Sequence, residues 1–380
     1  MEKTHILAYT LLRPLTTLFV RLKFGYTYKP ADNLPEGNYI VLSNHTTDYD
    51  PLLVASSFRR QMYFVGSEHI ARWKMFYKPL HYFFAPIMRP KGTLGVSTTM
   101  EVLRRVRGGS NVCIFAEGAR SWDGITAPIL PSTGRTVKSA RCALVTYKLV
   151  GGYFASPMWS TKNTRRGYVH GEVVNVYTKE QLAEMSVDEI NEVINRDLHE
   201  DAYARQLADP KPYRGRNLAE PMENLLFLCP KCGAHGTIRT AGDTVSCTGC
   251  GMSFRYDIYG MLQDAPFRTV TELARWQQEQ VHLDARDGIV YTVPNGVLST
   301  VKNHVEEIVD QGEVRLCGDT LRCGNTEIPL SEILDMQIHG RHALVFSTCS
   351  NYYELVSQEH NALKFKLLYS AHKQRVKTET

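Results

Sequence analysis

Short apolar runs alternate with longer amphipathic segments over the first half of the chain. Four short runs of apolar, largely β-branched or aromatic residues lie at 38–43, 61–66, 83–88 and 111–116. The segments between them have helix-like patterns, and they lie at 51–58, 68–80 and 94–107. A strand-like run at 168–176 then precedes a helical pattern from Ser186 to about Arg205. Strands that alternate with helices predict an α/β fold, a sheet flanked by helices.

The pattern changes after residue 208. A stretch rich in proline and charge at 209–216 predicts a linker. Further on, a helical pattern at 269–283 is followed by short strand-like runs at 314–316, 320–322, 343–347 and 352–356, and by a helix-like segment at 361–370. Strands with a closing helix resemble pleckstrin-homology-like or GRAM-like modules, and a generic β domain for protein contacts is the alternative. We expect an N-terminal helix at 1–30, an α/β domain at 31–208, a linker at 209–223, a cysteine module at 224–262 and a mostly β domain at 263–380.

The N-terminal segment 6–24 is apolar but interrupted. Three basic residues and a proline break it, so it lacks the ~18 clean apolar residues that a membrane-spanning helix needs. Five leucines recur at three- and four-residue spacing and form one stripe: Leu7, Leu11, Leu15, Leu18 and Leu22. We expect an interfacial helix in the lipid headgroup region, with packing on the protein's own core as the alternative. No cleavage site of a signal peptide follows, so we expect a cytoplasmic, peripheral membrane protein.

Charge is divided between the two halves of the chain. Residues 1–171 hold 23 Lys and Arg against 9 Asp and Glu, a balance of +14, which leaves 21 against 30, or −9, for the remainder. A basic half attracts anionic membrane surfaces and phosphorylated substrates. The basic residues are scattered singly and in pairs, without a run of five or more, so we expect no nucleic-acid partner.

Four of the nine cysteines form two CxxC pairs, and they are Cys229, Cys232, Cys247 and Cys250. Two such pairs at hairpin spacing are typical of a zinc ribbon, in which four thiolates complete a tetrahedral site and leave no position for water. We therefore predict a structural zinc and expect no catalytic metal. The simplest role is to stabilise a module too small for its own core, and contact with another macromolecule is the alternative. The five scattered cysteines are expected to be reduced thiols in a cytosolic setting.

A polar turn follows the apolar run 38–43. In it, Asn44 is expected to form the turn, and the Asp50 carboxylate can orient the His45 imidazole as a general base. The spacing alone has little weight, because His282 and Asp287 share it. His45 differs in following a strand-like run, since catalytic groups tend to lie on loops held by a rigid scaffold. We predict that His45 and Asp50 are catalytic and that His282 is a solvated residue at a helix end.

A second polar turn follows the run 111–116. Glu117, Gly118 and Arg120 lie in it. The glycine permits a close backbone approach, and a guanidinium can grip a phosphate through two parallel hydrogen bonds. A base near a phosphate site predicts an enzyme that deprotonates a hydroxyl on a phosphate-bearing molecule.

Taken in order, four blocks of the sequence resemble those of the glycerolipid acyltransferases typified by 1-acylglycerol-3-phosphate acyltransferase. The blocks lie at 44–50, 84–89, 115–121 and 155–158, and the resemblance covers residues 1–205. Ala116 stands where the family usually has proline, and Ala119 where it has threonine. The fourth block is loosely matched, so the resemblance bears more on the chemistry than on the acceptor.

The resemblance implies an acyltransferase domain at 31–208 and a role for each residue. The chain would move a fatty acyl group from acyl-CoA or acyl-carrier protein to the free hydroxyl of 1-acylglycerol 3-phosphate. His45 would be the base and Asp50 its orienting group, while Arg89 and Arg120 would bind the acceptor phosphate. Glu117 would fix Arg120 or touch the acceptor. The alternatives are another lysophospholipid as acceptor, or a non-catalytic lipid-binding or zinc-ribbon adaptor, which the retained His45 and Asp50 argue against.

Overall fold

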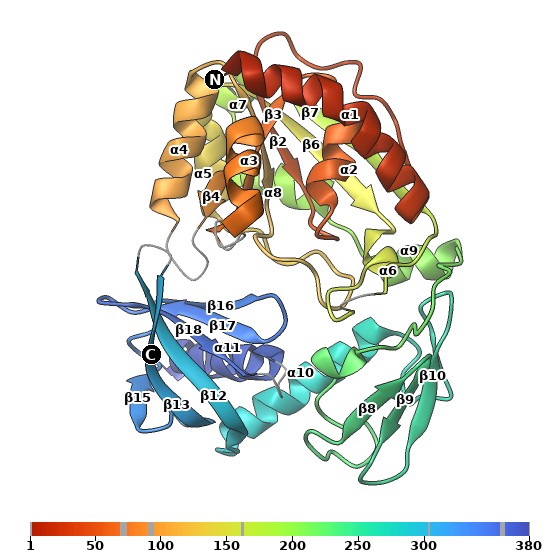
Figure 1. The fold of residues 1–380 in the computed structure, drawn as a ribbon, viewed down its shortest axis with the longest axis vertical. Helices are drawn as coiled ribbons and strands as arrows, with labels where there is room; N and C mark the ends of the chain where they lie inside the picture. Colours follow the sequence, from red (N-terminus) through yellow and green to blue (C-terminus); the bar gives the residue numbers. More distant parts are fainter. Residues whose placement is uncertain are drawn as a thin grey trace. The chain divides into compact units, whose positions relative to one another are not determined.

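The chain forms two compact units (Figure 1). The computed structural model describes residues 2–68, 74–89, 95–160, 163–302, 305–357 and 362–379. The first unit contains residues 1–89, 96–218 and 257–260, and the second contains residues 90–95, 219–256 and 261–380. Each unit has its own sheets and its own buried apolar side chains.

A seven-stranded sheet lies at the centre of the first unit, in the order β1-β7-β6-β2-β5-β3-β4. Its strands are β1 (Tyr26–Tyr28), β2 (Tyr39–Ser43), β3 (Met62–Ser67), β4 (Ile87–Arg89), β5 (Asn111–Phe115), β6 (Ala143–Val150) and β7 (Val169–Tyr177). β7 runs antiparallel to β6, whereas the other described neighbours pair in parallel. The predicted α/β class is confirmed. Within the apolar run at 83–88, residues 83 and 84 end a helix, and the strand begins only at Ile87.

Helices surround this sheet. They are α1 (Glu2–Phe24), α2 (Asp50–Ser57), α3 (Lys74–Phe84), α4 (Val96–Arg107), α5 (Ser132–Ala140), α6 (Gly152–Ala155), α7 (Lys179–Glu184), α8 (Val187–Leu198) and α9 (Ala202–Ala208). Of the helices expected at 68–80 and 94–107, residues 69–73 and 94 lie outside the described residues. The helical pattern from Ser186 to Arg205 forms two helices, because Asp201 caps a new one by accepting a 2.9 Å hydrogen bond from the Ala204 amide.

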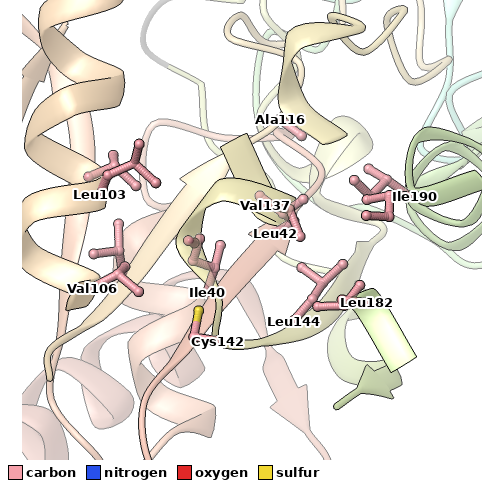
Figure 2. Packing of buried hydrophobic residues seen from close by; sticks show 14 of the residues in the cluster. Ile40, Leu42, Leu103, Val106, Ala116, Val137, Cys142, Leu144, Leu182 and Ile190 are labelled. Atoms are coloured by element: carbon pink, nitrogen blue, oxygen red, sulfur yellow. The ribbon is translucent and has the colours of Figure 1, made fainter. Parts of the chain in front are cut away.

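Both faces of the sheet are covered. On one face, Ile40 and Leu42 of β2 lie in a buried cluster with side chains from α4, α5, α7 and α8 (Figure 2). On the other face, Phe58 at the end of α2 packs its ring 5.4 Å from that of Tyr147. All five residues of β2 are therefore fully buried, which explains its unbroken apolar sequence.

Helix α1 buries one face and exposes another. Tyr9 is buried, and its hydroxyl donates to the carbonyls of Ala55 and Phe58 at 3.0 and 3.1 Å. Val20 and Phe24 are fully buried farther along the helix. The five leucines of the predicted stripe are between 55% and 64% exposed, so it is a different face of α1 that packs on the protein. Among the described helices, none combines the length and the apolar character that crossing a bilayer requires.

The stretch 209–216, predicted to be a linker, belongs to the first unit. Tyr213 is only 3% exposed. Its amide donates to Ile258 O at 2.6 Å and its hydroxyl to Tyr168 O at 2.7 Å. A single buried aromatic ring thus fixes a segment whose composition is that of a linker.

The second unit opens with a four-stranded antiparallel sheet that carries the cysteine module. Its strands are β8 (Ile238–Ala241), β9 (Thr244–Cys247), β10 (Ser253–Tyr256) and β11 (Leu262–Gln263). Helix α10 (Val270–Arg286) follows and starts at a capping box formed by Thr269 and Glu272. Gln277 of α10 accepts from the amide of Phe227 at 2.9 Å and donates to Leu225 O at 2.9 Å. The module is therefore fastened to the helix by a buried side-chain amide.

The rest of the second unit is a seven-stranded sheet in the order β15-β14-β13-β12-β18-β17-β16. Its strands are β12 (Tyr291–Lys302), β13 (Val305–Cys317), β14 (Thr320–Cys323), β15 (Thr326–Pro329), β16 (Asp335–His339), β17 (Ala343–Ser347) and β18 (Tyr352–Val356). The four predicted strands are confirmed. The length of β12 and β13 was not predicted, because Pro294 and Gly296 interrupt the pattern at a bulge between Val293 and Gly296. Helix α11 (Ala362–Glu379) closes the unit, and residue 361 of the predicted helix lies outside the described residues.

Candidate functional site

The polar turn after β2 brings His45 and Asp50 together. Nδ1 of His45 lies 2.8 Å from Oδ2 of Asp50, and the Asp50 side chain is completely buried. Before the turn, the Asn44 amide donates to Leu149 O and accepts from Leu149 N, both at 2.8 Å. Asn44 thus continues the pairing of β2 with β6 by one residue and fixes where the turn begins. The predicted pair is brought into contact at the carboxyl end of a central strand.

The Asp50 carboxylate is held by the turn that precedes it. The amides of Thr46 and Thr47 donate to it at 2.5 and 2.9 Å, and the two threonine hydroxyls at 3.1 and 2.7 Å. These donors compensate the burial of the carboxylate and leave its orientation little freedom. The carboxylate in turn accepts from Nδ1–H of His45, so Nε2 keeps its lone pair for accepting a proton.

The His45 ring also packs on an aromatic neighbour. Its centroid lies 4.6 Å from that of Phe115, with 23° between the two planes. Phe115 ends β5, the strand beside β2. The His45 side chain remains 22% exposed, so a substrate can approach an imidazole whose tautomer and tilt are both fixed.

Glu117, at the start of the second turn, holds the backbone of the first. Its carboxyl accepts from His45 N at 2.6 Å and from Ala127 N at 2.7 Å. Burial raises the pKa of the Glu117 carboxyl to about 8, although the two amide donors act in the opposite direction. Near neutral pH most molecules therefore carry this group protonated. The sequence had suggested that Glu117 fixes Arg120 or touches the acceptor, but these two hydrogen bonds run to backbone amides.

The Arg120 side chain is buried beside the polar turn after β2 and is only 3% exposed. Nε donates to Thr46 O at 3.1 Å, Nη1 to Asp48 at 2.9 Å, and Nη2 to Ser156 O. The sequence predicted an arginine open to a phosphate, and this structure places its guanidinium among protein acceptors instead.

Arg89 and Gly118 meet across the end of the sheet. Gly118 has a left-handed backbone, with φ of +69°, and a Cβ built on it would lie 2.6 Å from Nη1 of Arg89. Arg89 ends β4, and Gly118 follows β5, so two strands that are not neighbours bring them together. Two features require glycine at position 118. Its positive φ disfavours other residues, and the Arg89 guanidinium leaves no room for a Cβ atom.

A comparison with known protein families finds one match to the segment that contains this site. Residues 26–150 match the family model described as Acyltransferase. This segment is an acyltransferase domain. It contains β2, β5, both polar turns and each of the site residues from His45 to Arg120. No curated protein sequence matches the chain.

Two solved structures resemble parts of the chain. The 1-acyl-sn-glycerophosphate (LPA) acyltransferase PlsC from Thermotoga maritima has 16% identity and a TM-score of 0.45, over 53% of this chain and 80% of that chain. The N-terminal PH domain of human ARAP2 has 15% identity and a TM-score of 0.19, over 23% of this chain and 83% of that chain.

A small pocket lies at the polar turn after β2. His45, Thr46, Glu117, Ser121 and Glu200 are among its lining residues, and none of the lining residues is a lysine or an arginine. A phosphate would find no cation there.

Several residues of the acyltransferase domain's site were not predicted. Thr46 and Thr47 donate to Asp50, and Asp48 and Ser156 accept from Arg120. The threonines had a local signal, since hydroxyl residues just before a helix often bond a nearby carboxylate or backbone. Ser156 lies in the fourth block at 155–158, but its contact with Arg120 had no local signal, because the two residues are 36 positions apart.

The other histidine and aspartate with the same spacing, His282 and Asp287, belong to the second unit. His282 is in α10, and the Asp287 carboxylate pairs with Arg286 at 2.9 Å. The prediction that His282 is a solvated helical residue is consistent with its exposed position.

The four predicted metal ligands form one cluster in the second unit. The sulfur atoms of Cys229, Cys232, Cys247 and Cys250 all lie within 4.8 Å of one another. The Cys229–Cys250 and Cys232–Cys247 sulfur distances are 3.7 and 3.9 Å. A tetrahedral ion with bonds of about 2.3 Å to sulfur separates its ligands by about 3.8 Å. The cluster therefore fits a metal ion held by four thiolates.

We expect Gly118→Ala to lower the rate of the acyltransferase domain more than the same substitution at a matched glycine does. A side chain at φ +69° costs about 1–2 kcal/mol in stability, and the new Cβ must also push Arg89 aside. Initial rates should fall about tenfold or more because Arg89 moves. Gly37→Ala is the control, since Gly37 has φ of +84° with no atom within 4 Å of its Cβ position. Equal losses of rate in the two variants would show that the Arg89 contact is unimportant.

Proposed function

We propose that the protein transfers a fatty acyl chain from an acyl thioester to the free hydroxyl of 1-acylglycerol 3-phosphate, giving phosphatidic acid. The observation that carries this proposal is the His45 imidazole, bonded at 2.8 Å to a buried, fully coordinated Asp50 within an acyltransferase domain. The donor is acyl-CoA or acyl-carrier protein. Thioesters are already activated, so a positioned base suffices and no serine or cysteine nucleophile is needed.

In the proposed reaction, Nε2 of His45 accepts the proton of the acceptor hydroxyl while the oxygen attacks the thioester carbonyl. The bond from carbonyl carbon to sulfur then breaks, and the thiolate leaves. The proton on His45 passes to that thiolate, which returns the imidazole to its neutral form. Asp50 holds the ring and stabilises the imidazolium between these steps.

We propose Arg89 as the contact for the acceptor phosphate. It ends β4 and lies over Gly118, beside the turn that holds His45. A guanidinium binds phosphate through two parallel hydrogen bonds, which would orient the glycerol hydroxyl toward the base. The missing side chain of Gly118 leaves room for that approach.

We propose further that the protein is a cytoplasmic, peripheral membrane protein held by α1 and by the basic first half of the chain. The leucine stripe of α1 is exposed, and the helix ends against the catalytic turn. The rings of Phe19 and Phe24 lie 6.0 and 5.2 Å from the Tyr49 ring, and the Lys23 ammonium lies 5.0 Å from it. A helix lying in an anionic interface would therefore bring the turn that holds His45, Tyr49 and Asp50 close to the lipid acceptor.

Membrane binding should depend on the stripe itself. Because α1 also buries Val20 and Phe24, the better test replaces Leu11, Leu15 and Leu18 with glutamine rather than deleting the helix. Vesicle binding and activity on bilayer acceptors should fall about tenfold or more, while activity on a short-chain soluble acceptor survives. Leu207→Gln, at a leucine 41% exposed on α9, is the control. Unchanged vesicle sedimentation in the triple variant would place the membrane contact elsewhere, with the C-terminal β domain the next region to test.

Two alternative functions predict different results in acylation and vesicle-binding assays. The acceptor is another lysophospholipid if the phosphate-headed substrate is not preferred. The protein is a lipid-binding or zinc-ribbon adaptor if no acceptor is acylated although vesicles are bound. The buried Asp50–His45 pair favours an enzyme, because burying a carboxylate is costly where it serves no purpose.

The deciding experiment is an assay of the purified protein. Radiolabelled acyl-CoA and acyl-carrier protein are each offered with a panel of lysolipids that differ in headgroup, and lipid products are separated. The proposal expects label in phosphatidic acid above all other products. Preference for another headgroup supports the first alternative, and no labelled product with any pair supports the second.

A further inference from the structure

Arg120 bridges two segments that meet at the active site. One is the catalytic turn, which supplies Thr46 O and Asp48, and the other is the segment after α6, which supplies Ser156 O. Each of the three guanidinium nitrogens donates to a different one of these acceptors. A planar, rigid fork is well suited to joining three fixed oxygen atoms.

The bridge bears directly on the catalytic pair. Thr46 lies between His45 and Asp50, its amide donates to Asp50 at 2.5 Å, and its carbonyl accepts from Arg120 at 3.1 Å. The same peptide segment is thus held from both sides. The Thr46 carbonyl shares a peptide plane with the Thr47 amide, which donates to Asp50 at 2.9 Å. Releasing the carbonyl would let that amide tilt away from the carboxylate that orients the imidazole.

A phosphate has no ready access to this guanidinium. The Arg120 side chain is 3% exposed, whereas Asp48, which pairs with it, is 68% exposed. An incoming phosphate would meet the Asp48 carboxylate first and would have to displace it against like-charge repulsion.

We infer that Arg120 is a positioning residue that fixes the catalytic turn, and that it does not contact the acceptor phosphate. This inference rests on the proposed acyl transfer. It assigns the arginine of the second turn to geometry and leaves recognition of the phosphate to Arg89.

The test compares Arg120→Lys with Arg89→Lys on two acceptors, 1-acylglycerol 3-phosphate and the monoacylglycerol that lacks the phosphate. A lysine at 120 keeps the charge but cannot serve three acceptors. We expect its kcat to fall about 10- to 100-fold on both acceptors, as a displaced catalytic group does, with KM values within about twofold of the parent protein. The ratio of kcat/KM between the acceptors should stay unchanged in Arg120→Lys and shrink in Arg89→Lys. A raised acceptor KM and a reduced ratio in Arg120→Lys would overturn the inference.

A second variant distinguishes the two roles by its effect on the KM for the phosphate acceptor. Asp48→Asn removes one partner of Arg120 at an exposed position. If Arg120 positions the turn, kcat falls several-fold and the KM for the phosphate acceptor does not improve. If Arg120 binds phosphate, the loss of a competing carboxylate lowers that KM.

Hydrogen exchange gives a readout that needs no activity. Positioning predicts faster amide exchange in a peptide covering residues 44–50 of Arg120→Lys, because the turn is loosened, with Arg89→Lys unchanged there. Equal exchange in Arg120→Lys and the parent protein would overturn the inference. If the parent protein acylates no lysolipid, the proposed function fails, and the exchange data still decide whether Arg120 holds the turn.

Discussion

Replacing His45 with alanine should reduce acyl transfer by about 10²- to 10⁴-fold, which is the contribution a general base makes. Nδ1 of His45 lies 2.8 Å from Asp50, so Nε2 is the ring nitrogen left to accept a proton. Initial rates with radiolabelled donor and lysolipid measure the effect. Stability and vesicle binding should change little, because the His45 side chain is partly exposed and its backbone contacts persist.

His282→Ala is the matched control. It removes the histidine of the other pair with the same spacing, from an exposed position on α10. Its rate should equal that of the parent protein. Retention of more than about a tenth of the parent rate in His45→Ala would rule out the general-base role.

The purified protein should contain about one zinc per chain, and losing it should unfold the cysteine module. Structural zinc in small modules contributes an apparent 10–16 kcal/mol, more than such a module gains from its own core. Cys247→Ser should therefore lose the metal and expose residues 224–262 to proteolysis. Metal analysis and limited proteolysis measure the two effects.

Cys349→Ser, at an exposed thiol outside the cluster, is the control and should retain the metal. A protein purified without zinc would contradict the prediction. So would chelation that stops catalysis and leaves the 224–262 module intact, because the metal would then act in the reaction.

Much of the architecture could be predicted because each element depends on the pattern of hydrophobic and polar residues in its own segment. β2 and β5 are buried on both faces, so their sequences are continuous apolar runs. β6 is also largely buried, yet its run at 143–150 was not among the predicted strands. The break between α8 and α9 depends on one capping aspartate, Asp201, inside a sequence that otherwise continues the helical pattern.

The contact between His45 and Asp50 could be predicted for a similar reason, since the two residues are five positions apart and the turn is local. Arg120 could not be placed in the same way. Its partners Asp48 and Ser156 lie 72 and 36 residues away, and only the order of strands in the sheet brings them together. Sequence indicated a functional arginine, but burial and long-range partners decide what its guanidinium contacts.

The protonated state of Glu117 has a consequence for the charge balance during turnover. Burial raises its pKa to about 8, so near neutral pH the carboxylate that bonds the imidazole, Asp50, is charged while the carboxyl that bonds the His45 amide is mostly neutral. When His45 gains a proton, that one charge is matched by one positive charge, and the pair is electrically neutral. The thioester oxygen, which becomes negative as the hydroxyl attacks, is then not opposed by a charge on Glu117. An ionised carboxylate bonded to the His45 amide would oppose that developing charge and slow the step it helps to align.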